Sequence, residues 1–355
     1  MSRYEKETYR VALEQLRSVV NHADQQSRVF FMCGELAISW DLLPQSTWFA
    51  FDKHNGPIYV GPTEKQQRFY EHLSVVISDL DVVTTLVYRL QWQIKKFIDD
   101  KDFLSSDDMS VFLLADVHAF HAEFRSLMDS LCHVINIASS KTGQVPTESF
   151  NQLRKWCIQS GKRSEDALGL ELSKLIAEAH WFLEIRDLRD RIIHRQSGAV
   201  VRCMNPPGEI AFTILKARSS ELYEGPNAFL YNGWIYFCAH AGYYLGRLIF
   251  LLNQVCQMAA QNLRLKLNDV NWSTPRLIAA FQCINSAIKA LELGFPLSTE
   301  LCQEYPEEPG LCASLHEKIS IRAYFLSLAS KNQTDQLLNW CAAEREQLRF
   351  IPDNK

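Results

Sequence analysis

The chain has 355 residues, of which 47% are hydrophobic and 22% charged, and its formal net charge is −4. This is the composition of a folded globular protein with a large core, and the length fits two domains or one domain with extensions. The mild negative charge excludes a strong overall attraction to nucleic acid or to anionic lipid, so either contact would need a local basic patch.

Apolar residues recur at helical spacing along most of the chain, and the breaks in this pattern divide it into helices. Residues 41–64 contain five prolines and glycines and are expected to form a loop with a short strand at 48–51. Thr63 followed by Gln66 is the pattern of a capping box at the start of a long helix. The expected helices cover residues 4–23, 64–99, 105–138, 150–159, 164–195, 230–267, 274–293, 314–330 and 334–348, and a further apolar stretch covers 29–40.

Two consecutive long helices, 64–99 and 105–138, joined by a short polar loop predict an antiparallel helical hairpin. Farther along, short β-type runs on either side of Asn205-Pro206-Pro207-Gly208 predict a β-hairpin insertion at 199–216. Gly242 and Gly246 stand four residues apart within an expected helix. This spacing lets a neighbouring backbone approach closely, and we interpret it as a packing contact.

We therefore predict an all-α fold, a long antiparallel helix bundle with a small β-hairpin insertion and helical extensions at both ends. The predicted organisation is an N-terminal helical extension at 1–62, a bundle at 63–268 that contains the hairpin, and a C-terminal helical extension at 269–355.

The cysteines, the first residues of the chain and the most apolar stretch indicate in which cellular compartment the protein is expected. The ten cysteines include no Cys-x-x-Cys pair, which favours buried thiols in a reducing cytosol over a structural zinc site. Four of the first seven residues are charged, unlike a signal peptide. The most apolar stretch, 234–260, contains His240 and Arg247, so we expect a buried helix rather than a membrane span. We expect a soluble, cytoplasmic protein with no membrane partner.

The segment with the clearest chemistry is 184–195, in which arginines and acids precede His194. On a helix Asp190 and His194 are i,i+4 neighbours, so the carboxylate can accept a hydrogen bond from the imidazole and fix its tautomer. The same spacing predicts an ion pair between Arg186 and Asp190. From the residues alone two interpretations stay open, a charged helix end stabilised by ion pairs and a site at which His194 exchanges a proton.

The spacing of Arg189, Asp190 and His194, at the end of the third helix of a long-helix bundle, resembles the signature of the HEPN superfamily. The resemblance covers about residues 64–267, and some bacterial HEPN-like proteins of unknown role share this layout. It implies a HEPN-like bundle and the activity of many members, metal-independent cleavage of RNA. Other members only bind nucleotides or proteins, so a non-catalytic HEPN-like binding or scaffold protein is the alternative.

RNA supplies its own nucleophile, the 2′-OH, so an acid/base histidine and an arginine that stabilises the transition-state charge suffice for cleavage. The resemblance implies that His194 is the acid/base, that Arg189 contacts phosphate and that Asp190 orients the imidazole. Further phosphate contacts are expected from Arg186, Arg191 and Arg195. Residues 184–195 carry four arginines and three acids, a small basic surplus for an RNA binder.

One chain supplies only one histidine and one arginine of this kind, so the resemblance implies a homodimer with the motif at its interface. No cofactor and no metal is expected. The expected partners are a second copy, RNA and, for a toxin or defence protein, a protein antitoxin.

Other histidines are expected to be structural. His118 and His121 stand near Asp116, but the Glu-x-x-His pairs of di-iron bundles are missing, so we expect a polar helix face. Asp129 and His133 are i,i+4 neighbours, and we expect a hydrogen-bonded core or edge histidine. The sequence contains no P-loop, G-x-G-x-x-G or G-x-S-x-G motif, so nucleotide hydrolysis, dehydrogenase and esterase functions have no support.

Overall fold

The computed structural model describes residues 3–25, 49–52, 56–59, 63–99, 106–194, 199–204, 209–214, 223, 225–231, 233–263, 265 and 275–293. Most of these residues are helical, which confirms the mostly helical fold that the sequence predicts. The predicted apolar stretch at 29–40 and the predicted helices at 314–330 and 334–348 lie outside the described residues.

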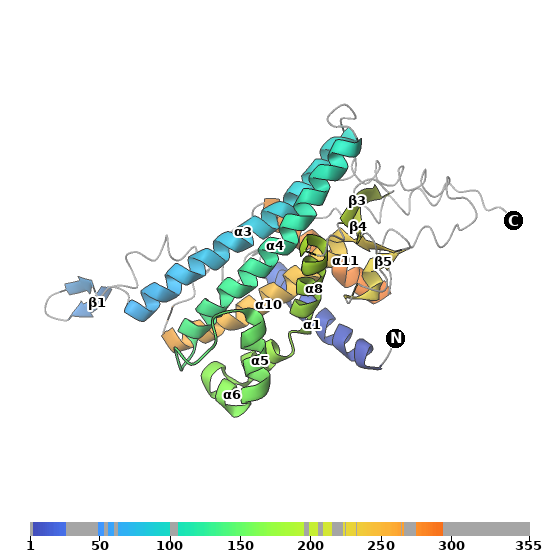
Figure 1. The fold of residues 1–355 in the computed structure, drawn as a ribbon. Helices are drawn as coiled ribbons and strands as arrows, with labels where there is room; N and C mark the ends of the chain where they lie inside the picture. Colours follow the sequence, from blue (N-terminus) through green and yellow to red (C-terminus); the bar gives the residue numbers. More distant parts are fainter. Residues whose placement is uncertain are drawn as a thin grey trace.

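Two long helices, α3 (Glu64–Asp99) and α4 (Ser106–Ala138), run side by side in opposite directions (Figure 1). Contacts near both ends of the pair define the direction. His72, early in α3, stacks on His133, late in α4, with ring centroids 5.1 Å apart. Arg89, late in α3, donates to the buried carboxylate of Asp116, early in α4. The predicted helical hairpin is therefore confirmed.

The start of α3 is fixed by the predicted capping box. The backbone N–H of Gln66 donates to the hydroxyl oxygen of Thr63 at 3.2 Å, and the backbone N–H of Thr63 donates to Oε1 of Gln66 at 2.9 Å. Each side chain thus satisfies a backbone donor that the first turn of a helix leaves without an intrahelical acceptor.

Replacing Thr63 by alanine is expected to lower the free energy of unfolding by about 1 kcal/mol, because the backbone N–H of Gln66 loses the hydroxyl that accepts its hydrogen bond. Ser74→Ala is the matched control, since the exposed Ser74 hydroxyl donates to the carbonyl oxygen of Glu71 within the same helix. Alanine is the better helix former there, so the control should be neutral or slightly more stable. Urea unfolding of both variants measures the difference, and equal effects would contradict the capping role.

The predicted single helix at 164–195 is wrong, because the chain forms three shorter helices there. These are α6 (Lys162–Leu168), α7 (Leu170–Ala177) and α8 (His180–His194). Gly169, with φ of 83°, adopts a conformation that other residues disfavour, and it ends α6. A second break follows α7, where the backbone N–H of His180 bonds to the carbonyl oxygen of Glu178. The preceding helix, α5 (Phe150–Ser160), agrees with the predicted 150–159.

The β-hairpin insertion is confirmed and belongs to a larger sheet than predicted. Strands β3 (Ala199–Met204) and β4 (Glu209–Ile214) pair antiparallel, with Ala199 opposite Ile214. The sheet has the order β3-β4-β6-β5, and its two short strands β5 (Leu230–Tyr231) and β6 (Trp234–Tyr236) fall where a helix was predicted. The predicted strand near 48–51 is present as β1 (Phe49–Asp52), and it pairs with β2 (Gly56–Tyr59).

The remaining helices pack around α10 (Phe237–Leu263), most of whose residues are buried. A Cβ added at Gly242 would overlap the backbone of Cys283 on α11 (Pro275–Leu293), and one added at Gly246 would overlap Leu16 on α1 (Arg3–Gln25). The predicted close approach of a neighbouring backbone is confirmed at Gly242, whereas Gly246 is approached by the side chain of Leu16. Within the described ranges, no helix combines the length and apolar character that crossing a membrane requires.

Candidate functional site

The predicted motif lies at the carboxyl end of α8, which packs on α4. Oδ1 of Asp190 accepts a hydrogen bond from the guanidinium of Arg189 at 2.8 Å and a longer one, at 3.4 Å, from Arg125 of α4. The side chain of Arg189 is only 19% exposed. The structure therefore brings Arg189 and Asp190 together as an ion pair and adds a second guanidinium that the sequence does not reveal.

The predicted ion pair between Arg186 and Asp190 is wrong. Arg186 instead donates twice, through Nε at 3.0 Å and a terminal nitrogen at 2.7 Å, to Oδ1 of Asp187. The prediction considered one helix alone, whereas Arg125 reaches Asp190 from the neighbouring helix. Arg125 also lies 3.8 Å from the carboxylate of Asp129 on its own helix.

The third member of the motif, His194, is the last residue of α8. Its side chain and the whole of Arg195 lie outside the described residues, so the hydrogen bond between Asp190 and His194 stays a prediction. Arg191 is partly exposed.

Cations and acids are nearly balanced around this helix end. Arg125, Arg186 and Arg189 have Asp129, Asp187 and Asp190 as their ion-pair partners. An anion that binds here must compete with these carboxylates for the guanidinium groups. Only an anion that makes strong, two-pronged contacts with arginine, as a phosphate can, would compete with these carboxylates.

A second polar cluster, which the sequence reasoning missed, is buried between α4, α10 and Tyr223. Nε2 of His121 lies 3.0 Å from Nε2 of His240, Nδ1 of His121 lies 2.7 Å from the carbonyl oxygen of Val117, and the hydroxyl of Tyr223 lies 3.1 Å from Nδ1 of His240. His121 and His240 are fully buried. The expectation that His121 belongs to a polar helix face is therefore wrong, because α10 and the sheet cover it.

The carbonyl oxygen of Val117 sets the direction of every hydrogen bond in this cluster. A carbonyl can only accept, so Nδ1 of His121 carries a proton and Nε2 of the neutral ring is an acceptor. His240 must then donate through Nε2, which makes its Nδ1 the acceptor for the Tyr223 hydroxyl. Burial lowers the pKa of His121 to about 4 and also lowers that of His240, so both rings are neutral at pH 7 and each has one donor and one acceptor.

The buried cluster is linked to α8 by Tyr244. Its ring meets that of His240 edge-on with centroids 4.8 Å apart, and its hydroxyl donates to Glu184 of α8 at 3.2 Å. Burial is the largest cause that raises the pKa of Tyr244, and the nearby charge of Glu184 raises it further. The hydroxyl therefore stays protonated and fixes α8 to α10 at Glu184, which precedes Arg189 by five residues.

The predicted acidic residues of α4 have structural partners. Asp116 is buried and accepts from Arg89 and Gln93, and Oδ1 of Asp129 accepts the backbone N–H of Phe150 at 2.9 Å. His133 is exposed at the edge of the helical hairpin. In the part of the chain that the structure describes, no group of three or more histidine, cysteine, aspartate or glutamate side chains is placed to hold a metal ion.

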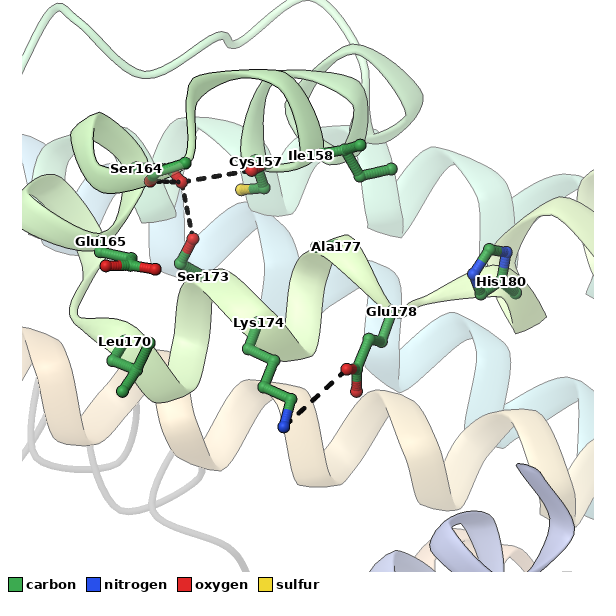
Figure 2. A pocket seen from close by; sticks show the side chains of 11 residues that line it. Cys157, Ile158, Ser164, Glu165, Leu170, Ser173, Lys174, Ala177, Glu178 and His180 are labelled. Carbon is green, nitrogen blue, oxygen red and sulfur yellow. Dashed lines mark hydrogen bonds and ion pairs between the residues drawn. The ribbon is translucent and has the colours of Figure 1, made fainter. Parts of the chain in front are cut away.

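A shallow hollow of about 550 Å³ lies over α5, α6 and α7 (Figure 2). Its two serines bond within the protein, because the Ser173 hydroxyl donates to Ser164 at 2.7 Å and the Ser164 hydroxyl donates to the carbonyl oxygen of Gly161 at 2.7 Å. Lys174 and Glu178 on its rim form an ion pair at 4.0 Å. The hollow therefore presents few polar groups directed at a ligand.

Comparisons with protein-family models, curated proteins and solved structures find no match to this chain. The end of α8 is the stronger candidate site, because the side chains of Arg125 and Arg186 are 35% and 26% exposed, whereas the histidine cluster is enclosed.

Proposed function

We propose that this is a HEPN-like protein of the toxin or defence type, and that the end of α8 is half of a metal-independent ribonuclease site completed by a second copy. The observation that supports the proposal most is the place of the motif. Arg189 and Asp190 are paired in the last turns of a helix that packs on the long α3–α4 hairpin and ends at His194.

In this proposal Asp190 has two tasks. Through Oδ1 it holds the guanidinium of Arg189 at 2.8 Å, and through its other oxygen it orients the imidazole of His194. Arg189 binds the scissile phosphate and stabilises the charge that develops there. His194 takes the proton of the 2′-OH or protonates the leaving oxygen, and the second copy supplies the partner acid or base.

The test is an RNA cleavage assay in the presence of a metal chelator. His194→Ala is expected to lower the cleavage rate by about two to four orders of magnitude, the usual contribution of a general acid or base. Arg189→Ala is expected to lower it to a similar extent. The matched control is His133→Ala, since His133 is exposed on α4 and should have no part in cleavage. Equal cleavage by the parent and all three variants would refute the assignment of these residues.

A non-catalytic HEPN-like binding or scaffold protein is the second candidate, and one observation favours it. Arg189 is mostly buried, and Asp190 holds it together with Arg125, an arrangement that stabilises α8 on α4. For such a protein, Arg189→Ala should lower the free energy of unfolding while no RNA cleavage is found in the parent. Measuring stability and cleavage on the same variants separates the two functions.

A further inference from the structure

Helix α3 has a second seam on the side that faces away from the core. Its inner seam is the buried apolar series Phe69, Leu73, Val76, Leu80, Val83, Val87, Leu90 and Ile94, which alternates steps of three and four residues. A second series with the same steps runs through positions 68, 71, 75, 78, 82, 85, 89, 92 and 96, and all of these except the partly buried 85 are exposed. We name this second series the outer seam.

The outer seam contains large apolar side chains that are open to solvent. Val75 is 49% exposed, Val82 42% and Trp92 42%, and Tyr88 beside the seam is 37% exposed. Steps of three and four residues place side chains in one line along a helix, and this is the spacing by which one helix packs on another in a coiled coil. The inner seam packs on the rest of the bundle, whereas the outer seam places Val75, Val82 and Trp92 at the surface of the described part of the chain.

Charge is distributed unevenly along the outer seam. Arg68 and the acid Glu71 lie toward its amino end, and Arg89 and Lys96 lie toward its carboxyl end, where Arg89 is paired with Asp116 of α4. A parallel copy would place Glu71 against Glu71 and Lys96 against Lys96, which is unfavourable. An antiparallel copy can instead place Glu71 against Lys96.

We propose that the outer seam of α3 binds the outer seam of a second copy of this chain, antiparallel and about a two-fold axis between residues 83 and 84. In this register Glu71 faces Lys96 of the second copy, and Val75 faces its Trp92. Next to the axis, Val82 of each copy faces Thr85 of the other copy. If the second helix were shifted by one heptad in either direction, Val75 would face Thr85 or Asp99 of that helix. The apolar contact between Val75 and Trp92 would then be lost.

A second copy fits this surface because one seam carries both halves of the contact, as a two-fold interface requires. Over α3 from 68 to 96 the paired helices would run for about 40 Å, at 1.5 Å per residue. The inference goes beyond the ribonuclease proposal and does not depend on it, since the outer seam and the end of α8 are on different helices.

The test is the molar mass of the full chain, measured by light scattering over a wide range of protein concentrations. Val82→Asp places two carboxylates at the two-fold axis and is expected to halve the mass. If the end of α8 also forms a two-fold contact, the parent is a tetramer and the variant a dimer, and otherwise a dimer becomes a monomer. Leu170→Asp is the matched control, because Leu170 is 59% exposed on α7 and its replacement should leave the mass unchanged.

Charge reversal gives a second measurement that a change in folding would not mimic. Glu71→Lys and Lys96→Glu are each expected to halve the mass, because each sets like charges against one another. The double variant is expected to restore it, since the two residues are too far apart on one helix to interact within a chain. A monomeric parent, an unchanged mass for Val82→Asp, or a double variant that stays dissociated would each overturn the proposal.

Discussion

Replacing Gly242 by alanine is expected to lower the free energy of unfolding by about 3 kcal/mol, the upper part of the range for overpacked cores. Alanine is the better helix former by about 1 kcal/mol, so intrinsic propensity predicts the opposite sign. The reason is the contact with α11, where the new Cβ would overlap the carbonyl group of Cys283 and the backbone nitrogen of Ile284. Backbone atoms cannot move aside by a rotamer change, so the two helices would have to separate.

Gly246→Ala provides the graded comparison. Its Cβ would meet Cδ2 of Leu16, the end of a flexible side chain that can adopt another rotamer, so we expect a loss of only about 1 kcal/mol. Gln261→Ala, at an exposed position of the same helix, should change stability by less than about 0.5 kcal/mol. Chemical unfolding followed by circular dichroism measures all three, and a Gly242→Ala variant as stable as the parent would contradict the close contact of α10 and α11.

The long helices were predictable because their signals are local. The inner seam of α3 is visible as an apolar repeat, and the capping pair Thr63 and Gln66 marks its first residue within one turn. The glycine pair in α10 was likewise interpretable, because four-residue spacing of glycines permits close packing whatever the partner. The sequence could not identify the partners, which are Cys283 of α11 and Leu16 of α1.

The predictions that failed depended on the rest of the molecule. Gly169 lies inside a helical pattern, and only its positive φ shows that the chain turns there instead of continuing. The residues 230–236 have helix-compatible apolar character, but β6 pairs with β4, with Phe212 opposite Ile235. A pairing across more than twenty residues overrides the local preference.

In the candidate site, too, contacts between sequence neighbours were predictable and contacts between distant residues were not. The pair Arg189–Asp190 consists of neighbours in the sequence, whereas Arg125 comes from 65 residues away. The contact between His121 and His240 joins residues 119 apart. A helical-wheel argument on α4 alone places His121 beside polar residues, and only the packing of α10 shows that it is buried and hydrogen-bonded.

Stability is expected to fall steeply in mild acid because of this histidine pair. Burial lowers the pKa of His121 to about 4 and lowers that of His240 in the same direction, whereas the unfolded chain has a histidine pKa of about 6.5. The unfolded state therefore binds protons first as the pH falls, so the stabilisation is full above about pH 6.5 and is lost below it. Down to about pH 4, His121 contributes a loss of about 1.4 kcal/mol per pH unit.

The direction of the hydrogen bonds explains why protonation of His121 and His240 is unfavourable in the folded state. A second proton on His121 would enter at Nε2, which already accepts from His240, and one on His240 would enter at Nδ1, which accepts from Tyr223. Each protonation thus breaks a buried hydrogen bond and places a charge beside apolar rings, those of Phe120 and Phe212 for His121 and that of Phe212 for His240. Burying a charge without a partner is strongly unfavourable.

The triple variant Tyr223→Phe, His121→Leu, His240→Leu removes the whole cluster at once, so that none of its members is left without a hydrogen-bond partner. Its free energy of unfolding should depend less steeply on pH between about 6.5 and 4.5 than that of the parent. His133→Gln, which removes an exposed histidine, should keep the slope of the parent. If the triple variant retained that slope, the histidine pair would not be the source of the acid sensitivity.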